Sequence, residues 1–240
     1  MLSVIVPAYR EGARIVENIG HLTVALDALE IPYEVVVVCD GSPDDTYEQA
    51  EKCASEQVRV FTYSPNMGKG YALTYGFERS TGDKVTFIDA DMDLHPKEIG
   101  IFLKLMDVYE ADVVVGSKRH PQSRVNYPLF RRFQSWVYQV LVRVLFDLNV
   151  SDTQTGLKLF RREVLEASLP RIIVKKFAFD LELFVIAHRL GFRNFIEAPV
   201  VLDFQFSSSV DLGSAWQVLG DTLKIYRRLR WSDRYGDRPN

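Results

Sequence analysis

The stretch Val85-Thr86-Phe87-Ile88-Asp89-Ala90-Asp91-Met92-Asp93 decides the fold, because an apolar run of strand length ends abruptly in three carboxylates. Side chains two apart on a strand share one face, so Asp89, Asp91 and Asp93 are expected to converge beyond the strand's carboxyl end. Carboxylate oxygens are the ligands that hard cations such as Mg²⁺ take. The stretch therefore predicts a metal site, although an isolated pattern of this kind also occurs in loops where water separates the acids.

Similar apolar, β-branched runs recur along the chain and alternate with segments of helical periodicity. This alternation is typical of an α/β domain whose mostly parallel sheet is covered by helices on both faces. In such sheets ligands bind beyond the carboxyl ends of the strands. The strands are expected at Leu2–Val6, Tyr33–Val38, Val58–Tyr63, Lys84–Ile88 and Asp112–Gly116, and helices at Ile15–Leu29, Asp45–Ala54 and Ile99–Tyr109.

The composition is that of an ordinary soluble globular protein, with 240 residues, 47% hydrophobic and 25% charged. A net charge of −3 gives no general attraction to nucleic acid, so we expect no nucleic-acid partner. Two cysteines without a disulfide framework suit a reducing compartment. With no leader sequence and no apolar run of membrane-spanning length, the expected location is cytoplasmic.

Polar residues follow each of the first two strands. Pro7 is expected to end the hydrogen-bond ladder of the first strand and to place Tyr9 and Glu11 at the edge of the sheet. Asp40 stands at the tip of the second strand, where we expect its carboxylate to be free to accept hydrogen bonds from a base or a ribose. These two strand ends therefore predict a nucleoside site.

A glycine-rich turn, Asn66-Met67-Gly68-Lys69-Gly70, follows the third strand and opens a helix. Backbone N–H groups at a helix start, together with the Lys69 ammonium, are well suited to bind phosphate. The spacing is neither that of a P-loop nor that of a dinucleotide-binding fingerprint. The turn therefore predicts a phosphate site of another kind, close to the carboxylates at Asp89 and Asp91.

The second half of the chain is more basic at its loops. Lys118 and Arg119 follow the fifth strand, and Arg131 and Arg132 open the apolar, helix-like segment Phe133–Leu148. That segment suits either a buried core helix or a helix that faces a membrane. A guanidinium at the start of an apolar segment suits the phosphate of a lipid that lies along the helix.

Taken in order, several motifs resemble family 2 inverting glycosyltransferases of the GT-A fold, and most closely the polyprenyl-phosphate (dolichyl-phosphate) mannose and glucose synthases. The resemblance covers about residues 2–205. The motifs are Pro7-Ala8-Tyr9-x-Glu11, Asp40-Gly41-Ser42, Asn66-x-Gly68-x-Gly70, Asp89-Ala90-Asp91, Gly116-Ser117-Lys118-Arg119, and Asp152-Thr153-Gln154-Thr155-Gly156 with the strand-like Leu157–Phe160 after it.

The resemblance implies inverting transfer of a hexose from GDP-mannose or UDP-glucose to a polyprenyl phosphate, with Mg²⁺ or Mn²⁺ as cofactor. Catalysis would then rest on positioning and electrostatics. The resemblance implies that the catalytic residues are Asp91, Arg119, Arg131 and Asp180, and that the metal ligands are Asp89, Asp91 and Asp93. It implies that the nucleotide sugar is bound by Pro7, Tyr9, Glu11, Asp40, Lys69, Asp89 and Gln154. The acceptor phosphate would be held by Lys118, Arg119, Arg131 and Arg132.

Asp180 is the residue whose role depends most on the acceptor. It lies near the start of a predicted helix, where it suits a cap or a positioning role. In relatives that glycosylate hydroxyl groups, an acid near this place acts as general base, whereas a phosphate acceptor is already anionic. The alternatives are therefore a transferase with a soluble or lipid hydroxyl acceptor and Asp180 as base, or a non-catalytic nucleotide-sugar binding module.

The C-terminal segment, residues 211–240, is expected to be an amphipathic addition to a catalytic domain of residues 1–210. Its apolar residues recur at helical spacing over Ser214–Trp231, which ends in the basic, tryptophan-bearing Arg227-Arg228-Leu229-Arg230-Trp231. Such a helix suits the membrane interface, at the cytoplasmic face, and it equally suits packing on its own domain. Peripheral membrane association and packing therefore both remain open from the sequence.

Overall fold

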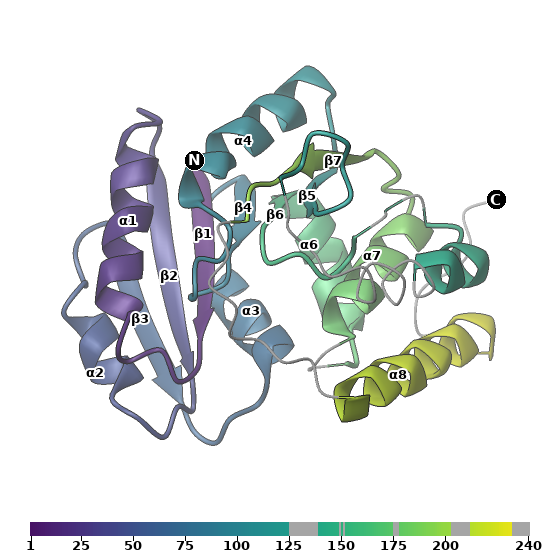
Figure 1. Cartoon of the computed structure of the whole chain (residues 1–240), viewed down its shortest axis with the longest axis horizontal. Coiled ribbons are helices and arrows are strands. Elements are labelled where there is room, and N and C mark those ends of the chain that lie inside the picture. The colour runs from purple at the N-terminus through teal and green to yellow at the C-terminus, as the bar shows by residue number, and fades with distance from the viewer. Residues whose placement is uncertain (125–138, 149, 151, 175–177, 203–211, 232–240) are drawn as a thin grey trace.

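A computed structural model describes residues 1–124, 139–148, 150, 152–174, 178–202 and 212–231, without the side chains of 212–219 and 231. Its centre is a seven-stranded sheet with helices on both faces (Figure 1). The expected α/β class and mostly parallel sheet are confirmed. The strands are β1 (Leu2–Ala8), β2 (Tyr33–Asp40), β3 (Val58–Tyr63), β4 (Lys84–Phe87), β5 (Val113–Ser117), β6 (Lys158–Arg161) and β7 (Phe195–Pro199).

The strand order is β3-β2-β1-β4-β6-β5-β7, and only β6 runs against its neighbours. Because β6 is reversed, it begins at the edge where the parallel strands end. Lys158 at the start of β6 pairs with Phe87 at the end of β4. The loop before β6 is therefore brought to the same edge as the carboxylates that follow β4.

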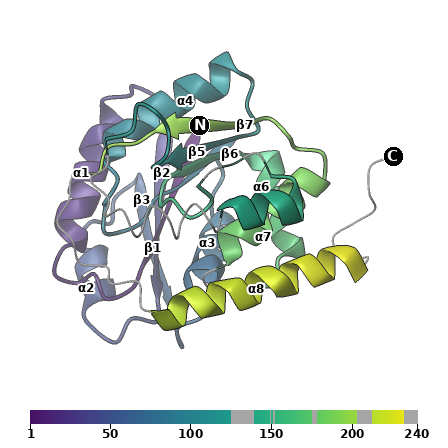
Figure 2. The same cartoon turned by 45° about the vertical axis from the view of Figure 1, so that its right-hand side comes forward.

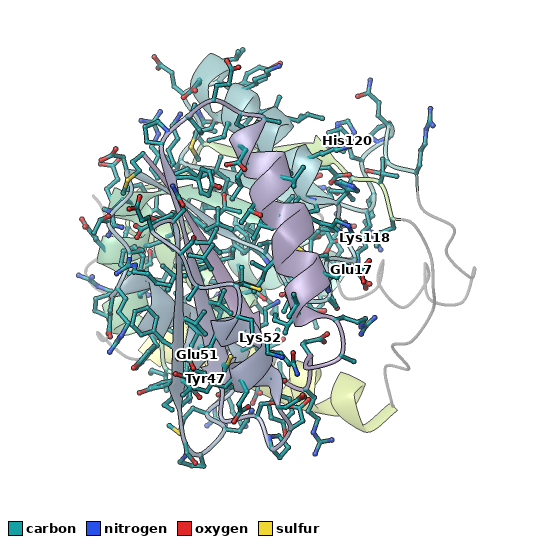
Figure 3. All side chains as sticks on the ribbon, turned by 90° about the vertical axis from the view of Figure 1, so that its left-hand side faces the viewer. Glu17, Tyr47, Glu51, Lys52, Lys118 and His120 are labelled. Carbon is teal, nitrogen blue, oxygen red and sulfur yellow. The ribbon has the colours of Figure 1, made fainter. Side chains whose placement is uncertain are left out.

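The strands β1 and β2 are buried on both faces, which explains why they read as continuous apolar runs rather than as alternating ones. One face of the sheet is covered by α1 (Ile15–Asp27), α2 (Thr46–Glu51) and α4 (Ile99–Val108), which follows the short helix η1 (Pro96–Glu98). Figure 3 looks onto this side and shows Glu17 on α1 and Tyr47 and Glu51 on α2.

The opposite face is covered by α3 (Lys69–Phe77), α6 (Arg162–Ser168), α7 (Phe179–Arg189) and α8 (Leu212–Trp231), with a short helix η2 (Leu169–Arg171) between α6 and α7. A further helix over residues 139–146 also packs here, through the buried Val142 and Phe146. Its Val144 is 76% exposed, so this helix is neither wholly buried nor wholly exposed. The remainder of the predicted segment Phe133–Leu148 that precedes residue 139 lies outside the described residues.

Pro7 was expected to end the first strand, but it does not. The strand β1 continues through Pro7 to Ala8 and stays paired with β2. The pairing of β1 with β4 stops earlier, at Ile5 and Phe87. Pro7 therefore lies where one side of β1 has no neighbouring strand to receive an N–H group, which is the position at which a sheet tolerates proline.

The C-terminal helix α8 packs on its own domain over the part whose side chains are described. Ile225 and Thr222 are fully buried, and the Arg189 guanidinium donates a hydrogen bond to the Leu229 carbonyl oxygen at 2.7 Å. Figure 2 shows α8 in yellow, along the side of the molecule that carries α3 and α7. Within the described residues no helix combines the length and apolarity needed to cross a membrane. The division of the chain at residue 210 remains a prediction.

Candidate active site

The carboxylates after β4 lie at the carboxyl edge of the sheet. Asp89 and Asp91 are half-buried, whereas Asp93 is exposed. Burial and the neighbouring Asp89 and Asp93 carboxylates raise the pKa of Asp91 to about 6. Both causes disfavour the ionised carboxylate, the first because it is removed from water and the second because like charges repel. This is the electrostatic environment that a divalent cation would relieve.

The role of Asp93 as a third metal ligand beside Asp89 and Asp91 stays a prediction. Among the described residues, no three histidine, cysteine, aspartate or glutamate side chains are grouped to hold a metal ion. The strand β4 ends at Phe87, so its alternation does not extend to the carboxylates, and Met92 between Asp91 and Asp93 takes a left-handed φ of 52°. The backbone N–H of Asp93 donates to Asp91 Oδ1 at 3.2 Å.

Lys69 faces these carboxylates from the first turn of α3. Its ammonium is paired with Asp89, and both side chains are about one-third exposed, at 38% and 34%. Burial disfavours the charged form of Lys69, but Asp89, Asp180 and Asp91 outweigh this and raise its pKa. Lys69 therefore stays protonated beside the candidate metal ligands, where it could also contact a diphosphate.

Asp40 is not free at the strand tip, in contrast to the expectation. Only 3% of it is exposed, and its carboxylate accepts hydrogen bonds from the Tyr63 hydroxyl and the Asn66 amide at 2.8 and 3.0 Å. It also accepts from the backbone N–H groups of Met67 and Gly68 at 2.8 and 2.9 Å. Asp40 thus fastens the glycine-rich turn to β2. Its contact with a nucleoside remains a prediction.

The other expected nucleoside residues follow β1. Tyr9 is 42% exposed, with the Arg10 guanidinium 5.4 Å from its ring centroid. Burial raises the pKa of Glu11, against the effect of Arg14, and the Asp93 and Asp89 charges add to the rise. Glu11 Oε2 is buried and accepts no hydrogen bond. Glu11 therefore belongs to the same acidic region, and its Oε2 lies 3.6 Å from the Arg14 guanidinium.

The basic residues that follow β5 lie at the same edge of the sheet. The Lys118 backbone N–H donates to Asp152 Oδ2 at 3.4 Å, and the Arg119 guanidinium donates to the Gln139 side chain. Figure 3 labels Lys118 and His120 on the right-hand side of the view. Gln154 is exposed, with its backbone N–H hydrogen-bonded to Asp152 Oδ1. Arg131 and Arg132, expected to hold the acceptor phosphate, lie outside the described residues.

Asp180 is not a helix cap, since α7 begins at Phe179 after Ala178 and Asp180 lies in its first turn. It is 7% exposed, and its Oδ1 lies 3.0 Å from the Lys158 ammonium, which is itself buried. Sequence reasoning assigned no role to Lys158. The signal was present, because Lys158 is the single charged residue within the apolar run Leu157–Phe160.

The sequence model of glycosyl transferase family 2 matches residues 3–169, well over half of the chain. The chain belongs to glycosyl transferase family 2. This confirms the resemblance seen in the sequence motifs, and makes the protein a glycosyltransferase. The matched segment contains every motif from β1 to β6, whereas Asp180 lies beyond it.

Two family 2 relatives illustrate the similarity. Glycosyltransferase AglD of Haloferax volcanii is 33% identical over 231 residues, which is 94% of this chain and 36% of the relative. Human dolichyl-phosphate beta-glucosyltransferase is 33% identical over 252 residues, covering 96% of this chain and 75% of the relative. The chain therefore spans about a third of the length of one relative and three-quarters of the other.

A solved structure shows the same fold. Glucosyl-3-phosphoglycerate synthase from Mycobacterium tuberculosis superimposes with a TM-score of 0.72 at 22% identity, over 94% of this chain and 80% of that chain. The same enzyme has been crystallised with Mn²⁺, uridine diphosphate and phosphoglyceric acid. At this level of identity the likeness establishes the GT-A type of fold for this family 2 chain.

Proposed function

We propose that this chain transfers glucose from UDP-glucose to a polyprenyl phosphate such as dolichyl phosphate, with inversion at the sugar. One observation supports binding of the donor. At the carboxyl edge of the sheet, half-buried carboxylates with too little positive charge lie close to a lysine and to the start of a helix. This arrangement suits a cation bound to a diphosphate. The sugar and acceptor follow the relatives named dolichyl-phosphate beta-glucosyltransferase, at 33% and 34% identity over 96% of the chain.

Asp91 and Asp89 would hold Mg²⁺ or Mn²⁺, and the chemistry of their oxygens fits either ion. When bound, such an ion neutralises the charge that develops on the departing nucleoside diphosphate. Lys69 adds an ammonium at the same place, and Glu11, Tyr9 and the backbone near Pro7 are proposed to hold the nucleoside. The chain's own contribution is therefore positioning and fixed electrostatics rather than a covalent step.

Lys118 and Arg119, together with Arg131 and Arg132, are proposed to bring the acceptor phosphate towards the sugar. A phosphate oxygen is anionic at neutral pH, so this acceptor needs no general base. The alternative, a hydroxyl acceptor deprotonated by Asp180, is disfavoured by one observation: Asp180 is almost fully buried and is paired with Lys158. A carboxylate held by an ammonium is a poor proton acceptor.

Turnover with defined substrates tests the proposal. The purified chain with Mn²⁺ would be incubated with radiolabelled UDP-glucose or GDP-mannose, and with dolichyl phosphate or unphosphorylated dolichol. Glucose is expected in the lipid phase with dolichyl phosphate alone, and Arg119→Ala should reduce it by at least tenfold. Transfer to dolichol at a similar rate would refute the phosphate acceptor, and binding of a nucleotide sugar without any turnover would favour a non-catalytic binding module.

Peripheral association with the cytoplasmic face of a membrane is proposed as well. Val144 and Leu223 are 76% and 52% exposed, and their helices meet where the Phe146 and Tyr226 rings lie 6.1 Å apart. Flotation of the chain with anionic vesicles should be weakened by Val144→Asp with Leu223→Asp. The control is Val24→Asp, which changes a similarly exposed valine on α1. Equal flotation of all three proteins would contradict the proposal.

A further inference from the structure

A second ion pair lies buried behind the pair formed by Lys69 and Asp89. Lys158, at the start of β6, is 1% exposed and donates a hydrogen bond to the Thr155 carbonyl oxygen. Its ammonium lies 3.0 Å from Asp180 Oδ1. The proposed reaction gives neither residue a direct role.

The two pairs form one electrostatic unit. Asp180 as well as Asp89 attracts the charge of Lys69, Asp89 as well as Asp180 attracts the charge of Lys158, and the two lysines repel each other. The four residues come from α3, the loop that follows β4, β6 and α7, and they meet at the junction of these elements.

Packing fixes this junction. A Cβ on Gly70 would lie 2.3 Å from the Phe179 ring, so only glycine lets the first turn of α3 approach the first turn of α7 this closely. A Cβ on Gly156 would lie 2.5 Å from Asp89 Oδ2, which brings the loop before β6 equally close to the acid. The placement of Lys69 and Asp89 therefore depends on the elements that carry Asp180 and Lys158.

Stability alone is a weak reason for such a pair. Two charges lose their hydration on burial, and apolar side chains of similar volume often give equal or greater stability. A role in holding neighbouring side chains in place accounts better for this buried ion pair. If a cation and a diphosphate bind at Asp89, the ion pair between Asp89 and the Lys69 ammonium is weakened. Asp180 then remains as a fixed carboxylate near Lys69.

We infer that Lys158 and Asp180 are positioning residues that hold the Lys69 ammonium and the Asp89 carboxylate in place for the donor diphosphate and its cation. Asp180 acts through Lys69, and Lys158 holds the Asp180 carboxylate in its orientation through their ion pair. The inference rests on the proposed donor binding but is independent of which acceptor the enzyme uses.

The test compares Lys158→Met, Asp180→Asn and the double variant, each titrated calorimetrically with Mn²⁺ and whichever of UDP and GDP binds the wild-type chain. Each single variant should have a lower Tm, because one buried charge is left alone, and at least tenfold weaker nucleotide affinity. The double variant should regain most of the Tm, since neither charge remains, while its nucleotide affinity stays at least tenfold weaker.

The matched control is Glu34→Gln at the opposite edge of the sheet, where Glu34 is 9% exposed and paired with Arg59. It should lower the Tm with nucleotide affinity unchanged. Wild-type nucleotide affinity in the double variant would mean that the pair serves only packing, and it would overturn the inference. Unchanged nucleotide affinity in all three variants would overturn it as well.

Kinetics separate positioning from proton transfer. In Asp180→Asn we expect the KM for the donor to rise at least tenfold and kcat to fall by a smaller factor. A collapse of kcat with an unchanged KM would instead assign Asp180 as the base and overturn the inference. Because the titration contains no acceptor, a failure to glycosylate dolichyl phosphate would refute the proposed function without touching this result.

Discussion

Replacing Asp40 with asparagine should destabilise the protein strongly, although the side chain keeps its shape. In the wild-type chain, Oδ1 accepts from the Tyr63 hydroxyl and the Met67 N–H, and Oδ2 accepts from the Asn66 amide and the Gly68 N–H. An asparagine has one acceptor oxygen, so one pair of donors loses its partner and faces the new NH₂ group.

The magnitude follows from the two hydrogen bonds that are lost. A buried hydrogen bond to a charged group contributes about 1.5–3 kcal/mol, and unpaired donors in a buried place are costly. Asp40→Asn should therefore lower the free energy of unfolding by about 3–6 kcal/mol. The change should also loosen the glycine-rich turn, so nucleotide affinity should fall in parallel.

Urea unfolding followed by circular dichroism measures the first effect. Asp45→Asn is the matched control, because Asp45 is exposed and its Oδ2 accepts one hydrogen bond from Gln49 at 2.7 Å. Surface changes of this kind stay within about 0.5 kcal/mol. If Asp40→Asn came within about 1 kcal/mol of the wild type, the view that Asp40 fastens the turn would be wrong.

Two further predictions concern the metal site. Because burial and Asp89 hold the pKa of Asp91 at about 6, a proton should compete with the cation there. Mn²⁺ affinity should thus fall up to tenfold per pH unit below pH 6, and a flat calorimetric profile from pH 7 to 5 would contradict this. Gly156→Ala should push on Asp89 and weaken Mn²⁺ binding, because its Cβ would lie 2.5 Å from Oδ2. Gly20→Ala, with open space on α1, should leave Mn²⁺ affinity unchanged and raise stability by about 0.5–1 kcal/mol.

The strands with continuous apolar runs were predictable because their signal is local. Buried parallel strands must be apolar on both faces, so β1 and β2 begin at the residues expected from the sequence. The edge strand β3 also begins where expected, at Val58, because its residues are mostly apolar or β-branched. The strand β7 was not predicted. Four of its five residues are partly exposed, and they include Glu197 and Pro199, so its apolar pattern is weaker.

The approximate location of the candidate site was also predictable. In a mostly parallel sheet the residues after each strand meet at one edge, so Asp89, Asp91 and Lys69 could be grouped without coordinates. The greater exposure of Asp93, beside the half-buried Asp89 and Asp91, was not predictable from its spacing. The strand ends at Phe87 and Met92 takes a left-handed backbone conformation, and the strand pattern encodes neither.

The sequence by itself determined the fold class, the family and the edge of the sheet that carries the chemistry, because periodicity and ordered motifs are properties of neighbouring residues. The tertiary structure alone decided what Asp40, Lys158 and Asp180 contact. Lys158 lies near the site because β6 runs antiparallel, which places its first residue at the carboxyl edge of the sheet. Asp180 lies there because α7 packs against α3. The partner of a buried charge lies far away in the chain, so its role depends on how distant elements pack.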